Sequence, residues 1–249
     1  MQYIKIKDVI VEQIEAGMLT AKQKLPAERQ LAETFNTTRV TLREALSLLE
    51  AEGRIYREDR RGWFISPPPL RYDPTQTLNF TNMARAQHRQ PKTELVSAKV
   101  EVANKLASKL LQLAPFSEVY CIERVRYLDH RPVAFVTHYV RPEYCPNLLD
   151  FDLSQSLTDT YQRHFSIQYQ KIRYRITTRS LFGETAQALR STTGTPATVV
   201  ERVNYNQYGE LIDCGIEYWR HDAISIESVA ELSHPAESDL SSCLTRADK

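Results

Sequence analysis

Apolar residues recur at the spacing of a helical face within the first fifty residues. One stripe comprises Ile6, Val9, Ile10 and Ile14, and another comprises Leu42, Ala45 and Leu49. Residues three and four positions apart meet on one side of a helix. Leu31 and Phe35 lie one turn apart between the two stripes. The pattern predicts three helices that pack together around a small core.

Residues suited to helix starts and turns separate these segments. Pro26 fits the first turn of a helix, where its missing N–H would make no bond anyway. Asn36 can adopt the left-handed conformation that ends a helix, and Thr37 or Thr38 can cap the next one. Gly53 ends that third helix. The second and third helices are therefore joined by a tight turn.

The third predicted helix carries basic groups beside its apolar stripe. Arg39 and Arg43 are one turn apart and displaced from the stripe, so both should point outward. Thr38 and Thr41 lie close to them. Arginine pairs with guanine edges, and threonine can bond phosphate or touch a thymine methyl. The helix suits the major groove of DNA, although an isolated pair of arginines is more often a solvated surface pair.

Two short strands are predicted after this helix, over residues 54–57 and 63–65, around the charged tip Glu58-Asp59-Arg60-Arg61-Gly62. The whole stretch resembles the winged helix-turn-helix of the GntR family of bacterial repressors. The resemblance rests on Leu25-Pro26, Glu28-Arg29, Leu31-Ala32, the run from Thr38 to Leu46, Leu49, Glu52-Gly53 and Arg61-Gly62.

The resemblance implies a set of DNA contacts. They fall on Arg29, Thr38, Arg39, Thr41, Arg43, Arg60, Arg61 and Gly62. Ala27 departs from the family pattern, which usually has Ser at that position and so gains a cap or a phosphate contact. Trp63, directly after Gly62, makes the wing bulkier than is usual in the family.

Prolines mark a boundary after this predicted head. Three consecutive prolines at 67–69 cannot form a helix and favour stiff, extended chain, and Pro74 follows them. We expect a winged helix-turn-helix domain over 1–66, a Pro-rich linker over 67–75, an effector domain over 76–233 and a flexible tail over 234–249. A stiff linker can pass a change in one domain to the placement of the other.

Strand-like runs alternate with short helical segments beyond the linker. Alternating apolar and polar residues predict strands over 93–102, 119–128, 133–140, 167–178, 198–205 and 211–219. Helices are expected over 103–111, 153–164 and 184–190. Two hairpins turn over 129–132 and 207–210. The fold class is therefore α+β, with a central antiparallel sheet behind the winged head.

A sequence echo links the two hairpins. Glu123-Arg124-Val125-Arg126-Tyr127 begins one, and Glu201-Arg202-Val203-Asn204-Tyr205 begins the other. This predicts two similar helix–strand–turn–strand units in one sheet, with a ligand cleft between them; chance similarity of a five-residue run is the alternative. The echo breaks where Arg126 corresponds to Asn204, an asymmetry that could orient an anionic ligand.

The order of elements resembles the UTRA effector domain of the HutC branch of GntR regulators, which has a chorismate-lyase-like fold. The resemblance covers residues 75–227 and rests on Arg124-Val125-Arg126, Pro132-Val133-Ala134, Tyr139, Gly194-Thr195-Pro196, Glu201-Arg202, Gly209 and Tyr218-Trp219-Arg220-His221-Asp222. It implies a small anionic effector. Arg124 and Arg126 are the candidates to bind it, because they share one face of their strand; pairing with Glu123 or Glu201 is the alternative.

Further candidate effector residues follow from the resemblance. Many relatives have Glu shortly before the Tyr of the second hairpin strand, where this chain has His138-Tyr139. That difference, together with Arg175 and Thr177, is more like regulators of phosphonate use than sensors of sugar phosphates. Asp213 or Glu217 could meet an ammonium group, as in 2-aminoethylphosphonate, and Tyr218 completes the set. A sugar phosphate or a histidine-pathway metabolite remains the alternative.

Composition narrows the function further. The chain has 32 Lys and Arg against 31 Asp and Glu, so it is nearly neutral, unlike a protein that coats nucleic acid non-specifically. Its four cysteines form no C-x-x-C pair and suit no zinc site. We expect free thiols in a reducing cytoplasm, with no signal peptide and no membrane span.

The predicted function is regulation of transcription. No nucleophile elbow, P-loop or dinucleotide fingerprint is present, so we expect no enzyme, cofactor or metal. We expect a homodimeric regulator, most simply a repressor, that binds an inverted-repeat operator in double-stranded DNA. A ligand-independent architectural DNA-binding protein is the other class, but it would not need a second domain with a pocket.

Overall fold

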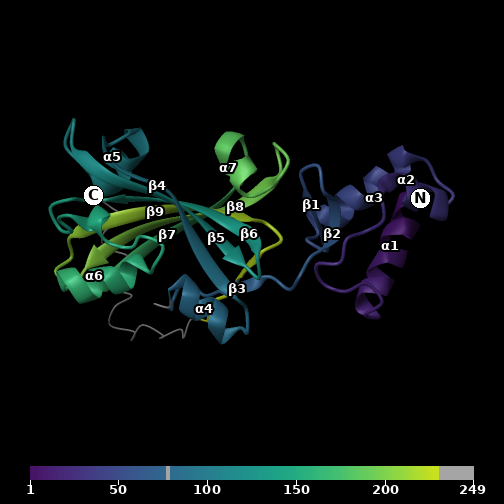
Figure 1. Ribbon diagram of the computed structural model, residues 1–249, viewed down its shortest axis with the longest axis horizontal. Helices are drawn as coiled ribbons and strands as arrows, with labels where there is room; N and C mark the ends of the chain where they lie inside the picture. The colour runs from purple at the N-terminus through teal and green to yellow at the C-terminus, as the bar shows by residue number, and fades with distance from the viewer. Residues whose placement is uncertain (77–78, 230–249) are drawn as a thin grey trace, which may run out of the picture.

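The computed structural model describes residues 1–76 and 79–229 and contains a helical head beside a larger sensor domain (Figure 1). In the head, α1 (Gln2–Glu15), α2 (Glu28–Thr34) and α3 (Arg39–Ala51) enclose one apolar core. The wing consists of β1 (Ile55–Glu58) paired antiparallel with β2 (Gly62–Ile65). The tail predicted over 234–249 lies outside the described residues.

The predicted apolar stripes form most of this core. Leu42, Ala45 and Leu49 of α3 are fully buried. Ile6 and Ile10 of α1 pack against them, but Val9 is 38% exposed and was wrongly placed in the buried stripe. The α1 stripe is therefore narrower than we predicted.

The sensor domain is built on a six-stranded antiparallel sheet with the strand order β4-β5-β6-β9-β8-β7. Its strands are β4 (Pro91–Val102), β5 (Glu118–Leu128), β6 (Arg131–Val140), β7 (Tyr169–Ser180), β8 (Pro196–Asn206) and β9 (Leu211–Arg220). The β5–β6 hairpin turns at Asp129 and His130, both with positive φ. Such a two-residue turn matches the right-handed twist of the strands it joins.

Helices cover both faces of the sheet (Figure 1). On one face lie α5 (Lys105–Leu111) and α7 (Gly183–Ala188), which pack on alternate residues such as Cys121, Val125 and Val199. On the other lie α4 (Phe80–Ala86) and α6 (Leu157–Phe165), which pack on Ile122, Val136 and Trp219 among others. A strand sends successive side chains to opposite faces, so each strand contributes to two cores.

The sheet consists of two similar halves. The succession β4-α5-β5-β6 is repeated as β7-α7-β8-β9, and the two halves meet where β6 pairs with β9. This agrees with the two units predicted from the sequence echo. Arg124 and Arg202 occupy equivalent strands, and both lie on the face covered by α4 and α6.

Several elements differ from the prediction. Helix α4 was not predicted, and neither was β3 (Leu70–Tyr72), which pairs in parallel with β10 (Ile224–Ile226). Residues 70–72 were expected in the linker, but Leu70 and Tyr72 are buried in the sensor core. Helix α6 starts later than predicted because the Ser156 side chain caps it, and a short 3₁₀ turn, η1 (Leu148–Asp150), precedes it.

Candidate DNA-binding surface and effector pocket

The start of α3 is set by a threonine cap. The Thr38 hydroxyl accepts a hydrogen bond from the Thr41 amide at 3.2 Å, and Asn36 has the expected positive φ of 46°. The cap places Arg39 in the first turn, where it is exposed together with Val40 and Arg43. The predicted outward orientation of Arg39 and Arg43 agrees with this exposure.

One carboxylate connects α3 to the wing. Glu28 accepts a hydrogen bond from Arg43 Nε at 2.8 Å and another from the Trp63 indole at 3.2 Å. Burial raises the pKa of Glu28, but the bonds from Arg43 and Trp63 outweigh it and hold that pKa below its usual value. Glu28 thus fixes the wing beside α3. Ala27, which replaces the Ser usual in the family, provides no side-chain cap.

The remaining predicted DNA contacts lie at the edge of the head. Arg29 is exposed and only 3.8 Å from Glu33. Arg60 at the wing tip has a side chain that is 93% exposed, and Gly62 has a φ of 98° that favours glycine. Arg61 donates to Glu58, which is buried beside it. Of the two wing-tip guanidinium groups, that of Arg60 is therefore the more exposed, although it lies 3.8 Å from Asp59.

A candidate effector pocket lies over the middle of the sensor sheet. β5 and β6 supply Arg124, Arg126 and His138, whereas β8 supplies Arg202 and Asn204. The starts of α4 and α6 close the other side, and the full lining is completed by Asn79, Phe80, Thr81, Thr93, Gln155, Ser156, Leu157, Thr158 and Tyr169. The two halves of the sheet thus contribute equivalent positions to one cleft, as the echo predicted.

Arg124 is a buried cation with no carboxylate partner among the described residues. It is 4% exposed and donates to the carbonyls of Leu153 at 3.2 Å and Gln155 at 2.9 Å, while its Nε has no partner. Burial, reinforced by the charge of Arg126, lowers its pKa to about 10, so it stays protonated at neutral pH. The predicted alternative, pairing with Glu123 or Glu201, does not occur: Glu123 bonds Ser97.

His138 is held in one neutral form. Its Nε2 lies 2.9 Å from Arg124 Nη2, and because a guanidinium only donates, Nε2 must accept. The proton is therefore on Nδ1, which has no partner. Burial and the charges of Arg124 and Arg126 push the pKa of His138 well below its ordinary value. Gly215 lies beneath the ring, since a Cβ there would come within 3.4 Å of it.

Arg126, in contrast, is already compensated. Its Nη1 donates to Glu217 at 3.1 Å, and Glu217 also accepts from the Trp219 indole at 2.8 Å and lies 3.7 Å from Arg202. Burial raises the pKa of Glu217, but Arg126 and Arg202 outweigh it and the pKa is lowered. Glu217 was predicted to bind an ammonium group of the effector. That prediction is corrected, because the Glu217 oxygens already face three donors of the protein.

The same correction applies to Asp213. Its carboxylate accepts hydrogen bonds from Tyr161 at 3.1 Å, Tyr169 at 2.7 Å and Asn204 at 2.5 Å. Burial raises the pKa of Asp213 in spite of these donors. Asp213 therefore serves to position the side chains around it and is not free to bind a ligand.

Four other predicted effector residues lie on the opposite face of the sheet. The Tyr139 hydroxyl accepts from Asn104 and packs with α5, and Tyr218 packs with Phe135 near α7. Arg175 is 68% exposed beside Glu201, and Thr177 lies two residues further along that face. Our expectation that they line the pocket is corrected. Alternation fixes the faces within one strand, but the pairing of strands decides which face meets α4 and α6.

Sequence reasoning missed the residues that close the pocket. Arg202 and Asn204 appeared in the echo but were not assigned to the site, although their match to Arg124 and Arg126 was the signal. Phe80 and Thr81 belong to the unpredicted α4, whose start is marked by the Asn79 cap on Asn82. That short capping pattern is easy to overlook in a single sequence.

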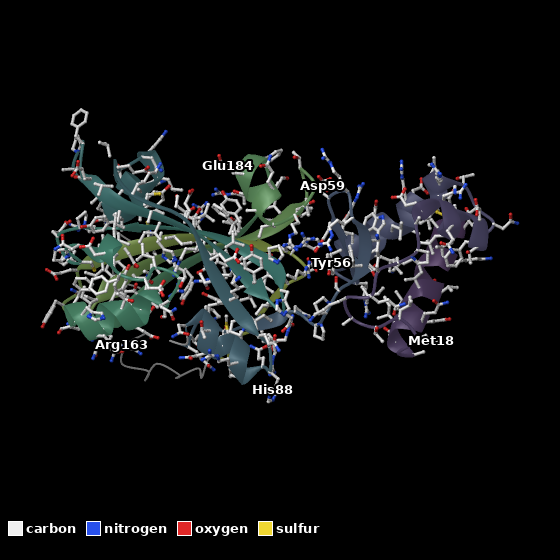
Figure 2. The ribbon with its side chains drawn as sticks, in the orientation of Figure 1. Met18, Tyr56, Asp59, His88, Arg163 and Glu184 are labelled. Atoms are coloured by element: carbon white, nitrogen blue, oxygen red, sulfur yellow. The ribbon has the colours of Figure 1, made fainter. Side chains whose placement is uncertain are left out.

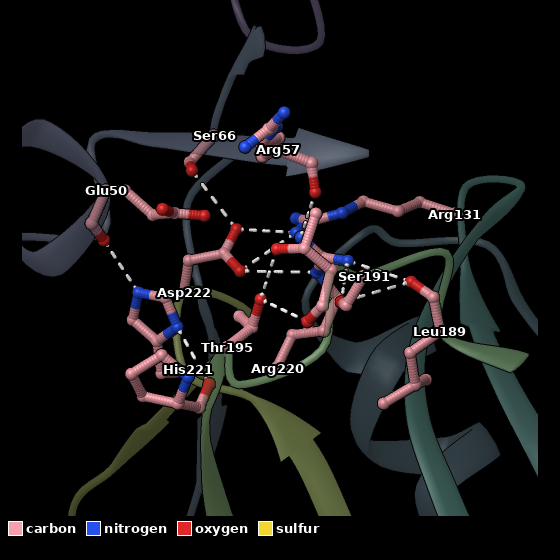
Figure 3. A network of polar contacts seen from close by, with 12 residues as sticks. Glu50, Arg57, Ser66, Arg131, Leu189, Ser191, Thr195, Arg220, His221 and Asp222 are labelled. Atoms are coloured by element: carbon pink, nitrogen blue, oxygen red, sulfur yellow. Dashed lines mark hydrogen bonds and ion pairs between the residues drawn. The ribbon is translucent and has the colours of Figure 1, made fainter. Parts of the chain in front are cut away.

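A polar network joins the head to the sensor domain (Figure 3). Arg131 donates to both oxygens of Asp222, at 2.9 and 2.7 Å, and Arg220 donates to the Arg57 carbonyl at 2.9 Å. The ring of Tyr56 lies under the Arg131 guanidinium at 3.4 Å. Figure 2 shows Tyr56 and Asp59 of the wing on the side toward the sensor domain, where the Asp59 amide donates to the Arg190 carbonyl at 2.9 Å.

Metal-ligating side chains do not gather in the part of the chain that the structure describes. No cluster of three or more His, Cys, Asp or Glu side chains suited to a metal ion occurs within 1–76 and 79–229. Over the same residues, no helix has both the length and the apolar character needed to traverse a bilayer.

Comparisons with known proteins agree with both domains. The UTRA domain family matches residues 86–225, more than half of the chain, and the bacterial regulatory proteins of the gntR family match residues 2–65. The HTH-type transcriptional regulator YihL of Escherichia coli (strain K12) is 28% identical over 222 residues, covering 88% of this chain and 94% of YihL. The HTH-type transcriptional repressor NagR of Bacillus subtilis (strain 168) is 27% identical over 220 residues, covering 88% and 90%.

Solved structures share the two-domain fold. PhnF from Mycobacterium smegmatis has a TM-score of 0.64 at 24% identity and covers 92% of this chain and all of its own. The matched domains and relatives are transcriptional regulators rather than enzymes. The chain belongs to the GntR family of DNA-binding transcriptional regulators, in the HutC-type group that carries a UTRA effector domain.

Proposed function

We propose that this regulator is a homodimeric repressor whose operator affinity falls when a small organic anion binds beside Arg124. The candidate anion is a phosphonate such as 2-aminoethylphosphonate. Binding of the operator falls to Arg29, Thr38, Arg39, Thr41, Arg43 and the wing tip at Arg60, Arg61 and Gly62. The exposure of the five arginines and Thr38 supports that role, and Thr41 and Gly62 are half-buried. Binding of the anion falls to Arg124, with Arg126 and His138 beside it.

The buried charge of Arg124 is the observation that carries the anion. An ion taken out of water costs several kcal/mol unless it is paired, and no carboxylate within the described residues pairs with Arg124. A guanidinium presents planar donors that match two oxygens of a phosphonate or phosphate. Its free Nε supplies a donor for such an oxygen. An oxyanion in the pocket would compensate a charge that the protein leaves open.

The strands that line the pocket also reach the head, which supports coupling between the two sites. β9 carries Glu217 beneath the pocket and ends at Arg220, next to Asp222 in the domain contact. Arg126 and Arg131 lie on the two strands of one hairpin. An anion that draws Arg126 away from Glu217 would disturb β5, which carries Arg126, and β9, which carries Glu217. It changes operator affinity only as far as it binds one head placement better than the other.

The outer edge of β4 supports dimer formation. Its exposed apolar residues are Leu95, Val96, Val100 and Val102. Lys92, Glu94, Lys99 and Glu101 share one face. If two copies pair antiparallel about residues 96 and 97, Lys92 lies opposite the second copy's Glu101 and Glu94 opposite its Lys99. Opposite charges across a strand pair are favourable. A two-fold dimer matches an inverted-repeat operator.

Sedimentation equilibrium tests this dimer. The double variant Glu94→Lys/Glu101→Lys places like charges across the strands and is expected to shift the protein to monomers. Adding Lys92→Glu and Lys99→Glu restores the complement and should restore the dimer. If the double variant is still a dimer, the dimer interface does not lie at the edge of β4.

Calorimetry and gel shifts test the whole proposal. The full-length protein is titrated with 2-aminoethylphosphonate, inorganic phosphate, several sugar phosphates and intermediates of histidine breakdown, and each is then added to the operator complex. We expect the phosphonate to bind best and to release the operator. If a sugar phosphate or a histidine-pathway compound binds best, the effector is not a phosphonate. If no anion changes operator binding, the protein has a ligand-independent architectural role.

A further inference from the structure

One buried acceptor in the pocket has no partner. Asn204 is 3% exposed, and its Nδ2 donates to Asp213 Oδ1 at 2.5 Å. Two tyrosine hydroxyls donate to the same carboxyl group, so it acts as an acceptor, and reversing the amide would set two oxygens against each other. Asn204 Oδ1 is therefore a fixed acceptor, and no group within the described residues donates to it. A buried polar atom left without a bond is costly and calls for an explanation.

The orientation of Asn204 is held from below. Asp213 is itself fixed by the hydroxyls of Tyr161 and Tyr169, at 3.1 and 2.7 Å. Three donors converge on this one carboxylate, so Asp213 cannot turn and release the amide. The Asn204 carbonyl oxygen is thus preorganised, as a group that recognises a ligand must be.

The acceptor differs in kind from the cationic groups, of which Arg202 lies two residues away on the same strand. Arg124, Arg126, Arg202 and the Nδ1–H of His138 all donate, so these four groups suit an anion. Asn204 occupies in the second half of the sheet the position that Arg126 occupies in the first. β6 and β9 separate β5 from β8, which places the two strand axes about 14 Å apart at ~4.8 Å per strand.

A single oxyanion does not satisfy both ends of this pocket. An anion held by Arg124 fills the donor side, and its oxygens would only repel the Asn204 carbonyl. We infer that the effector also carries a hydrogen-bond donor, an ammonium or a hydroxyl group, that bonds to Asn204 Oδ1. The effector is then a short organic anion with a donor at its far end. This deepens the proposed function and rests on it, because Arg124 must hold the anionic end.

Matched ligands test the inference without any variant. 2-Aminoethylphosphonate, 2-hydroxyethylphosphonate and propylphosphonate have the same anionic group and nearly the same length, but propylphosphonate ends in a methyl. Calorimetry on the full-length protein should show the two donor-bearing ligands binding about 10- to 100-fold more tightly than propylphosphonate. Equal affinity for all three overturns the role of Asn204 while leaving the anion site intact.

Two variants locate the effect. Asn204→Leu should reduce the preference for the donor-bearing ligands to about onefold and leave propylphosphonate affinity within about threefold. Tyr139→Phe is the matched control, because it removes a tyrosine hydroxyl on the opposite face of the sheet, where that hydroxyl accepts a bond from Asn104. Its preference should equal that of the unaltered protein. A preference that survives Asn204→Leu contradicts the inference.

The outcomes also separate this inference from the proposed function. If no phosphonate and no inorganic phosphate binds, the anion site at Arg124 is wrong and the inference falls with it. If all of them bind through Arg124 with no preference for a donor, only the inference falls. Thermal unfolding of each variant shows whether it is folded, and the ligand series on the unaltered protein decides the question in either case.

Discussion

The head and the sensor domain both offer arginines to an anion, but they hold them in opposite ways. In the head, Arg39, Arg43 and Arg60 are exposed, and the Arg60 side chain is 93% accessible. In the sensor domain, Arg124 is 4% exposed and is fixed by two backbone carbonyls and His138. The head arginines are exposed to solvent, whereas Arg124 is buried and already held in position.

The difference matches the two ligands. A duplex is a long polyanion with its own counterion atmosphere, so exposed cations gain affinity by releasing those ions and can adapt to its grooves. A small anion offers only a few oxygens, so its binding depends on donors that are already in position and already desolvated. In the proposed function, burial therefore separates the residues that contact DNA from those that bind the effector.

The largest effect is expected from removing the buried guanidinium of Arg124. Arg124→Leu should weaken binding of 2-aminoethylphosphonate at least about a hundredfold, from roughly 3 kcal/mol of lost charge-assisted bonding. Operator affinity without ligand should not change. Arg175→Leu is the control, because Arg175 lies exposed on the other face of the same sheet. Calorimetry and gel shifts measure both quantities, and equal losses in the two variants would make the effect non-specific.

The reciprocal test acts on the head. Arg39→Ala and Arg43→Ala should each reduce operator affinity about 10- to 100-fold, since one base-reading arginine contributes ~1–3 kcal/mol. Ligand affinity should stay the same, because both residues are remote from the pocket. Fluorescence anisotropy with labelled operator measures the change, with Arg71→Ala in the sensor domain as the control. If either variant still represses in cells, its assigned role is wrong.

A pH series tests how dry the pocket is. His138 has a pKa well below its ordinary value because of burial and Arg124, so the native state stays neutral where the unfolded state gains a proton. The neutral His138 contributes fully to the free energy of unfolding above the unfolded-state pKa near 6.5. That contribution is lost progressively as the pH falls below 6.5. Between pH 7.5 and 5.5 the loss is at most about 1.4 kcal/mol. Urea unfolding should show a shallower pH dependence for His138→Gln than for the exposed-site control His88→Asn.

The smallest expected effect concerns salt. Operator affinity should fall steeply with salt concentration, and Arg60→Ala should make the logarithmic slope shallower by about one if Arg60 neutralises a single phosphate. Ligand binding at Arg124 should vary much less over the same range, since buried pairs are poorly screened. Titrations from low to high salt measure both slopes. Parallel slopes would show that the two arginine sets do not differ as proposed.

Much of this contrast can be read from local sequence. The Thr38 cap, the buried stripe of α3 and the outward Arg39 and Arg43 follow from periodicity within one helix. The shared face of Arg124 and Arg126 follows from alternation within one strand, and the echo between Arg124 and Arg202 indicated the two halves of the sheet. These features depend on neighbours a few residues away, so a sequence pattern determines them.

The tertiary structure decided which groups meet across strands. Arg175 and Thr177 share a face as expected, yet pairing of Arg175 with Glu201 turns that face away from the pocket. Glu217 meets Arg126, 91 residues away in sequence, and Asn204 is left with an open acceptor only because Asp213 holds its amide. Register and packing between distant segments set these contacts. Local periodicity carries no information about either, because it describes one element at a time.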